Sequence, residues 1–258
     1  MRIIQALPFS LADSGPRDVS GVGNHVLKIY APDQSKSHLF TMYFLDSHAL
    51  LPPPMWNPFK DMRGKYDYIK QDQIDWFLDQ SNQIELLPRP FIPLSKGEDG
   101  TIYNDNGNSD INNVNQTPMK ANGMVFAHIP LREYYDSDPD LDENAKPIEG
   151  WGSRIDMDGA SQINSGFFNA ANTRLRNGLN AINEIKVIAH GHCHVTDDCK
   201  LIEGTWICFG GGSSYSGYSV QGFDKRFRVY DLLEWGETIE TFKRTENGEY
   251  IDKVILVN

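Results

Sequence analysis

The sequence lacks the marks of several classes of protein. No apolar run approaches the ~18 residues of a membrane-spanning helix, and the N-terminus lacks the apolar stretch of a signal peptide. No stretch is rich in Lys and Arg, and 24 basic against 35 acidic side chains give a net charge of −11. Since affinity for nucleic-acid backbones comes from clustered basic charge, we expect neither nucleic-acid backbone binding nor a membrane partner.

Cysteine is also scarce. The 258-residue chain has three cysteines, Cys193, Cys199 and Cys208, which lie close together in one short stretch. An odd number of cysteines so close together is no framework for a secreted disulfide scaffold. We therefore expect a reducing compartment and a cytoplasmic location.

The residues that are present are enough for a folded core, with 40% hydrophobic and 11% aromatic side chains. The length suits one large domain or two small ones. Apolar spacing at i, i+3 and i+4 predicts helices over 71–78 and 166–179. Strands mixed with only two clear helices indicate an α/β sandwich in which several late strands are antiparallel. The expected strands cover residues 25–30, 39–45, 124–128, 185–189, 205–209, 226–232, 239–244 and 253–257.

One segment in the first half of the chain has a different composition. Residues 95–120 are polar and rich in Asn, Gly and Asp. Such a composition buries too little apolar surface to offset the entropy lost on ordering. We therefore expect a flexible insertion over these residues.

Histidines are concentrated at the ends of two apolar strands. Of seven in the chain, His190, His192 and His194 directly follow one strand, and His128 ends another. In an extended segment His192 and His194 would project to one side, where neutral imidazoles can bind one metal ion or two adjacent ions. A turn at Gly191 is equally compatible with the sequence. The alternative interpretation is a surface strand end with solvated histidines.

These motifs and their order resemble those of a known family. The matching stretches resemble the C-terminal half of calcineurin-like metallophosphoesterases, particularly the fungal branch related to purple acid phosphatases. The resemblance extends over nearly the whole chain apart from the Asn-rich insertion. The stretches that carry it are residues 126–131 (FAHIPL), 187–194 (VIAHGHCH) and 210–212 (GGG), with further matches at 43–47, 66–76 and 164–167.

The resemblance implies a fold, a cofactor and a reaction. The fold would be an αββα sandwich of mixed sheets. The cofactor would be two divalent or trivalent metal ions, Fe, Zn or Mn, which activate water for attack on a phosphoester substrate, either a monoester or a diester. His128 and His192 would bind one metal and His194 the other, with His190 as a supporting residue.

The family also needs an upstream Asp-x-His, a Gly-Asp and a Gly-Asn-His-Asp/Glu segment, in that order, and the chain has no Gly-Asp. The segments 46–48 (DSH) and 23–26 (GNHV) look similar but occur in the reverse order, and Val26 replaces the acid. We therefore expect residues 1–258 to be the C-terminal part of one domain whose N-terminal half is missing. The catalytic acid and bridging Asp would then lie upstream of Met1. A truncated gene model, a split gene and a short protein all remain compatible.

Two expectations about function follow. The first is a phosphatase that is incompetent without the N-terminal motifs. The alternative is an inactive remnant that binds a partner or one structural metal, with a partner covering an exposed sheet edge. Near the proposed metals, we expect Cys193 to pack as a small apolar residue. The run 210–218 should form a tight turn, because it lacks the lysine and the helix of a phosphate-binding loop.

Overall fold

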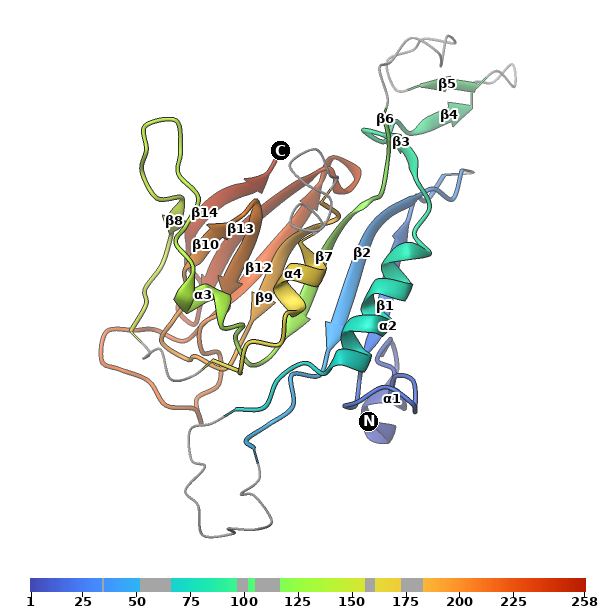
Figure 1. Cartoon of the computed structure of the whole chain (residues 1–258). Helices are drawn as coiled ribbons and strands as arrows, with labels where there is room; N and C mark the ends of the chain where they lie inside the picture. Colours follow the sequence, from blue (N-terminus) through green and yellow to red (C-terminus); the bar gives the residue numbers. More distant parts are fainter. Residues whose placement is uncertain (34, 52–65, 97–101, 105–116, 156–160, 173–182) are drawn as a thin grey trace.

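The computed structural model describes residues 1–33, 35–51, 66–96, 102–104, 117–155, 161–172 and 183–258. Its centre is a seven-stranded mixed sheet in the order β1-β2-β7-β9-β11-β10-β8 (Figure 1). The strands of this sheet are β1 (His25–Tyr30), β2 (His38–Leu45), β7 (Asn122–Ala127), β8 (Glu149–Gly150), β9 (Ile185–His190), β10 (Cys199–Ile202) and β11 (Thr205–Phe209).

The middle of the sheet is parallel. The pairs β2–β7, β7–β9 and β9–β11 are parallel. The outer pairs β1–β2, β11–β10 and β10–β8 are antiparallel. The carboxyl ends of four adjacent strands therefore meet at one edge. In α/β sheets this edge is where ligands usually bind.

Helices cover one face of the sheet and a second sheet covers part of the other (Figure 1). Helices α2 (Gln71–Asn82) and α4 (Phe167–Ala171) pack on the first face through Phe77 and Phe167, whose rings lie 5.3 Å apart. The remaining helical segments are α1 (Arg2–Gln5), α3 (Glu133–Asp136) and a 3₁₀ turn, η3 (Glu234–Gly236). Among the described helices, none has the length and apolarity to cross a membrane.

The second sheet is antiparallel and has the order β12-β13-β14. Ile239 and Leu256 of this sheet pack against Phe40, Met124 and Val187 of the large sheet. The described residues therefore form a helical layer followed by two sheets, and the second helical layer of the expected αββα arrangement stays a prediction. The strands are β12 (Arg226–Leu233), β13 (Thr238–Thr245) and β14 (Tyr250–Val257).

The sequence predicts most of these elements. The mixed α/β class and the antiparallel late strands are confirmed. The helix expected over 166–179 is present as the short α4, and residues 173–182 lie outside the described part of the chain. Strand β10 was not expected. It forms a two-residue hairpin with β11, and both turn residues, Glu203 and Gly204, have a positive φ.

The Asn-rich segment lies partly within the described residues. Of residues 95–120, 97–101 and 105–116 lie outside them, so the expected flexibility stays a prediction. Short strands in and directly before the rest of this segment pair in two small ladders, β3 with β6 and β4 with β5. These strands are β3 (Leu87–Arg89), β4 (Leu94–Lys96), β5 (Ile102–Asn104) and β6 (Thr117–Met119).

The structure joins two of the three cysteines, whereas the cytoplasmic location expected from the sequence stays a prediction. Cys199 and Cys208 stand opposite each other on β10 and β11 and form a disulfide, while the buried Cys193 is not disulfide-bonded. Sequence spacing could not show this, because the pairing depends on the register of a strand that had not been predicted. Cys193 contributes to the core on the helical side of the sheet.

Candidate metal centre

The carboxyl edge of the parallel strands carries a pocket of about 390 Å³. Strands β2, β7 and β9 contribute residues to its wall, and Gly210 of the wall directly follows the fourth parallel strand, β11. Polar side chains are few and mixed among aromatic and small residues. The wall is formed by Val22, Gly23, Phe44, Leu45, Asp46, Phe126, Ala127, His128, Ala189, His190, Gly191, Gly210, Arg228 and Tyr230.

His128 follows the last residue of β7 and is exposed. Its carbonyl oxygen accepts the N–H of Gly191 at 3.2 Å, which joins the two loops that leave β7 and β9. A Cβ atom at Gly191 would lie 3.0 Å from Nδ1 of His128. Because Gly191 has no side chain, there is room for the imidazole of His128 beside it.

His192 lies beside His128. The centroids of the two rings are 5.2 Å apart at an interplanar angle of 80°, and Tyr66 contacts the imidazole of His192 from another side at 4.6 Å. His192 has a φ of 66°, so the chain turns here rather than continuing as a strand. The turn brings together His128 and His192, which the sequence separates widely.

His194 is half-buried and stacks on Tyr218, with ring centroids 4.2 Å apart and an interplanar angle of 7°. Its Nδ1 lies 3.3 Å from the carbonyl oxygen of Tyr218. Two glycines of the same loop, Gly212 and Gly217, pack directly against it. The Gly- and Ser-rich run after β11 thus lies against His194, as the expected turn near the histidines requires.

The electrostatics of the edge favour a neutral imidazole at His128. Although this side chain is partly exposed, desolvation by the surrounding residues lowers its pKa, and the nearby His194 lowers it further. A histidine must be neutral to bind a metal ion, because its ring nitrogen donates a lone pair. His128 is therefore in the binding form at neutral pH.

His190 has a different environment from the other histidines of its cluster. It is only 4% exposed, and both ring nitrogens bond to the backbone: Nδ1 to the carbonyl of Ala127 at 3.0 Å and Nε2 to the N–H of Leu131 at 3.3 Å. Burial lowers its pKa to about 4. These bonds tie β7, β9 and the loop after His128 together.

The two segments that look like upstream motifs have structural partners. Asp46 accepts the N–H groups of Val22 and His48 at 2.8 Å each, one on each carboxylate oxygen. Asn24 accepts the N–H of Asp46 at 3.0 Å, and its amide donates to Ser20. His48 contacts Gln73 at 2.8 Å. These contacts hold the loops beside β2, and the interpretation that the two segments are not metal motifs stays a prediction.

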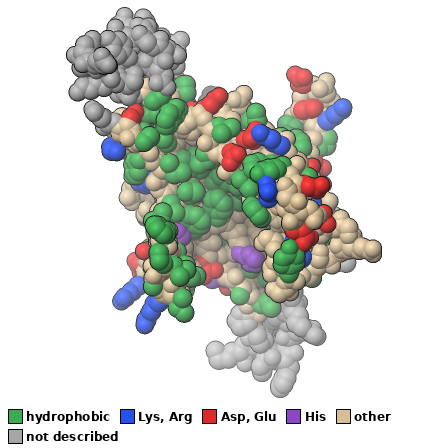
Figure 2. Space-filling model, turned by 180° about the vertical axis from the view of Figure 1, so that it is seen from behind, with side chains coloured by type: hydrophobic (Ala, Val, Ile, Leu, Met, Phe, Trp, Pro, Cys, Tyr) green, Lys and Arg blue, Asp and Glu red, His purple; other side chains and the backbone are tan. Residues whose placement is uncertain are grey.

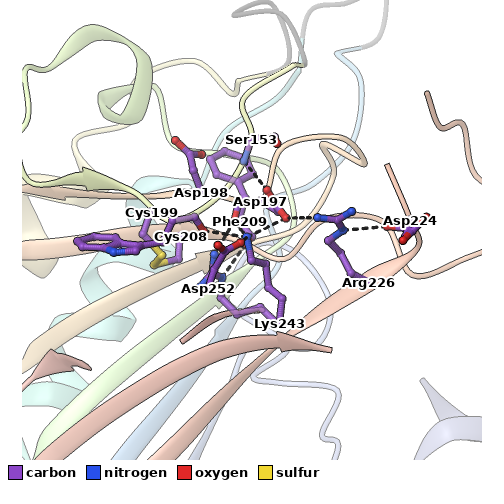
Figure 3. A network of polar contacts seen from close by, with 12 residues as sticks. Ser153, Asp197, Asp198, Cys199, Cys208, Phe209, Asp224, Arg226, Lys243 and Asp252 are labelled. Carbon is purple, nitrogen blue, oxygen red and sulfur yellow. Dashed lines mark hydrogen bonds and ion pairs between the residues drawn. A yellow bond between two sulfur atoms is a disulfide. The ribbon is translucent and has the colours of Figure 1, made fainter. Parts of the chain in front are cut away.

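A buried charged network anchors the loop that follows His194 (Figure 3). The carboxylate of Asp197 accepts the N–H of Ser153 at 2.6 Å and bonds to Lys243 at 2.9 Å and Arg226 at 3.1 Å. Lys243 also bonds to Asp252 of β14. Asp197 and Lys243 are both 0% exposed, so this network fixes the loop to the second sheet.

The structure brings some predicted ligands together and adds neighbours that the sequence did not suggest. His128 and His192 are adjacent and His194 lies near them, but within the described residues no group of three or more His, Cys, Asp or Glu side chains is arranged to hold a metal ion. Sequence reasoning missed Tyr66, Tyr218 and Asp197. The aromatic residues within the Gly- and Ser-rich run were the one signal that pointed to Tyr218.

A parallel sheet whose carboxyl edge carries histidines at two neighbouring strand ends is the architecture of an α/β protein with an edge site. No family model matches the chain. Among curated proteins, it is 30% identical over 276 residues to probable inactive purple acid phosphatase 29 of Arabidopsis thaliana, covering 100% of the chain and 60% of that protein. Probable inactive purple acid phosphatase 14 of the same plant is 29% identical, with 99% and 58% covered.

Phosphatase DCR2 of Saccharomyces cerevisiae is 25% identical over 256 residues, which cover 94% of the chain and 35% of that protein. The chain is thus distantly related to purple acid phosphatase-like proteins over nearly its whole length. It spans about 60% of the length of the two plant relatives.

Proposed function

We propose that this chain contributes imidazole ligands to the metal centre of a phosphoester hydrolase. His128 and His192 would bind one metal ion and His194 a second, with Fe, Zn or Mn as candidates. The observation that carries the proposal is the 5.2 Å approach of the His128 and His192 rings at the carboxyl edge of the sheet. Relationship to a protein called a phosphatase supports the reaction class.

The surroundings of the histidines suit a metal ion. Gly191 leaves room for the His128 ring, where a Cβ would lie 3.0 Å from Nδ1. The lowered pKa of His128 keeps that imidazole neutral. Bound metal ions in such centres supply Lewis-acid activation of water and of the phosphoryl group. The role of the residues of this chain is to bind and orient.

A carboxylate bridge is a separate requirement. Two cations repel each other, and a bridging carboxylate offsets that repulsion. At this edge Asp46 lines the pocket, but each of its oxygens already accepts a backbone N–H. We therefore expect the purified chain to bind metal while hydrolysing an aryl phosphate slowly.

The test measures Zn²⁺ and Mn²⁺ binding by titration calorimetry together with hydrolysis of p-nitrophenyl phosphate. We expect binding that is lost in His192→Ala and kept in the control His25→Ala, whose ring stacks on Phe44. Absence of binding in the unmodified chain would contradict the metal site. Rapid hydrolysis that His192→Ala abolishes would show instead that the chain supplies a complete centre.

A second candidate function is binding of another polypeptide without catalysis. Two observations favour it: the two plant relatives are named probable inactive phosphatases, and β12 pairs with a single neighbour, β13, within the described part of the chain. An edge strand with unpaired backbone groups can accept a further strand. The partner would therefore be a strand-forming polypeptide that covers this edge.

Amide hydrogen exchange tests the second candidate. If a strand adds to β12, the amides within 227–233 that point away from β13 become protected when the partner binds, while the amides already paired between β12 and β13 change little. Lasting fast exchange at β12 in a complex would rule out this edge as the binding surface. Protection at β12 without metal binding would favour the binding function over the hydrolase.

A further inference from the structure

We infer that Tyr218 and Gly217 form a socket that sets the orientation and tautomer of His194, so that its Nε2 carries the free lone pair. Tyr218 is a positioning residue in this arrangement. The inference rests on the proposed metal-binding function only in its second step. Its first step, the tautomer, concerns the metal-free chain and is tested separately.

Tyr218 contacts His194 at three points. The rings stack with centroids 4.2 Å apart and an interplanar angle of 7°. The backbone N–H of His194 donates to the phenol oxygen of Tyr218 at 3.0 Å. Nδ1 of the imidazole lies 3.3 Å from the carbonyl oxygen of Tyr218. One residue therefore holds both the backbone and the ring of His194.

The third contact fixes the tautomer. A carbonyl oxygen only accepts hydrogen bonds, so Nδ1 of His194 must carry the proton. In a neutral imidazole the other nitrogen, Nε2, then holds the lone pair that can bind a metal. A backbone carbonyl that bonds the second nitrogen is the usual way in which proteins orient a ligating histidine.

Gly217 closes the same edge of the imidazole. A Cβ atom at Gly217 would lie 2.4 Å from Cε1 and 2.5 Å from Nδ1 of His194, but 3.6 Å from Nε2. At Gly212 a Cβ atom would lie 2.9 Å from Cβ of His194. The loop backbone therefore covers the Nδ1 side of the ring, and any side chain at 217 would displace the imidazole.

A lysine holds the carbonyl groups of the socket. Nζ of Lys225 donates to the carbonyl oxygens of Gly217 and Tyr218, each at 3.3 Å. Because Lys225 stands directly before β12, this contact ties the loop to the start of the second sheet. The Gly- and Ser-rich run of residues 210–218 thus supports the imidazole of His194.

The first experiment determines histidine tautomers in the metal-free chain at pH 8 by long-range ¹H–¹⁵N NMR, with His194 assigned from His194→Gln. We expect Nδ1–H at His194 in the unmodified chain and a shift towards Nε2–H in Gly217→Ala, whose added Cβ would displace the ring from the carbonyl. Tyr218→Ala keeps this backbone carbonyl but loses the stacked ring and the phenol contact, so we expect a smaller shift in the same direction. His25 is an internal control, because its Nδ1 faces the carbonyl of Gly23 at 2.7 Å and should not change. Circular dichroism checks that each variant folds.

The second experiment measures Zn²⁺ affinity by chelator competition. We expect Tyr218→Ala and Gly217→Ala to weaken binding roughly 10- to 100-fold. Tyr218→Phe keeps the stacked ring and loses only the hydroxyl contact, so its loss should be a few-fold. Tyr215→Ala, in the same loop at 79% exposure, is the matched control and should bind like the unmodified chain.

The outcomes separate the socket from the metal site. An Nδ1–H tautomer that persists unchanged in Gly217→Ala overturns the socket. The complete absence of a shift in Tyr218→Ala overturns the part given to the Tyr218 side chain. A tautomer shift without any change in Zn²⁺ affinity overturns the presentation of Nε2 as the binding atom. A tautomer shift in a chain that never binds Zn²⁺ overturns the proposed function and leaves the socket in place.

Discussion

The imidazole of His190 lies between two backbone groups, the carbonyl of Ala127 and the N–H of Leu131. Because the ring is buried, a proton on its second nitrogen would break the bond from Leu131 and charge a group without access to water. A histidine of this kind stabilises the fold only while it is neutral. Its neighbours in the sequence, His192 and His194, lie in less buried surroundings.

We predict that His190 makes the stability of the protein pH-dependent. Its pKa is lowered from 6.5 to about 4 in the folded state, so the unfolded chain binds more protons between these values. The free energy of unfolding should therefore fall as the pH drops from 6.5 towards 4, with a loss of about 2 kcal/mol at pH 5. Urea unfolding at pH 7.5 and 5.0 measures the difference.

The variant His190→Gln is the comparison, because glutamine does not titrate. The gap between the two pH values should shrink by about 2 kcal/mol in this variant. An equal gap in both proteins would contradict the assignment. If the variant does not fold, direct NMR titration of His190 in the unmodified chain decides the matter, and a pKa near 6.5 would show that the idea is wrong.

At the scale of secondary-structure elements, β13 shows how a polar residue enters the core. Lys243 extends between the two sheets, where its ammonium group bonds to Asp197 at 2.9 Å and to the carbonyl of Trp151 at 2.8 Å. A buried pair of this kind adds little net stability over an apolar pair, but removing one partner leaves an uncompensated charge. The network therefore specifies where the loop after His194 is held.

We predict a large difference between two lysine substitutions on this sheet. Lys243→Met should lower the free energy of unfolding by about 3 kcal/mol, because Asp197 and Asp252 both lose an ion-pair partner and the buried Asp197 keeps only Arg226. Lys253→Met is the control: Lys253 pairs with Glu240 at 2.9 Å but is 65% exposed, so its loss should be below about 1 kcal/mol. Similar urea midpoints for the two variants would show that the network does not anchor the loop.

The hairpin of β10 and β11 carries a second prediction. Because Cys199 and Cys208 form a disulfide and Cys193 does not, an Ellman titration of the denatured chain without reductant should detect one thiol. After reduction it should detect three. Replacing both bonded cysteines with alanine should cost roughly 2–3 kcal/mol, since the bond closes a short loop in the unfolded chain. Three thiols before reduction would contradict the disulfide.

At the scale of the whole molecule, one face of the large sheet is only partly covered. Beside β12, half-buried apolar side chains of β1, β2 and β7 form a continuous surface within the described part of the chain, and Figure 2 shows hydrophobic side chains gathered on this side of the molecule. Contiguous apolar patches usually mark contact surfaces. The patch comprises Leu27, Ile29, Met42, Phe44, Phe126, Tyr230 and Leu232.

We predict that the purified chain self-associates through this patch despite its charge of −11. Met42→Lys places a charge within the patch and should shift the chain towards monomer in sedimentation velocity at micromolar concentration. Leu141→Lys adds the same charge at an exposed leucine in the loop before β8 and should leave association unchanged. A monodisperse unmodified monomer would contradict the prediction.

Patterns of neighbouring residues in the sequence predicted many of the strands and the class of the fold. Alternation and apolar runs located β1, β2, β7, β9 and β11, because those signals depend on residues that are close in sequence. The same patterns placed His128 and His190 at strand ends, since the strands stop there. The mixed class of the fold followed from the strand and helix count alone.

Tertiary structure decided the rest. The approach of His128 to His192 depends on the parallel pairing of β7 with β9 and on a turn with positive φ. The stacking of Tyr218 on His194, the Cys199–Cys208 bond and the burial of Lys243 each join segments whose register is set by packing. Local sequence does not encode that register, because it depends on the free energy of burying whole faces against one another.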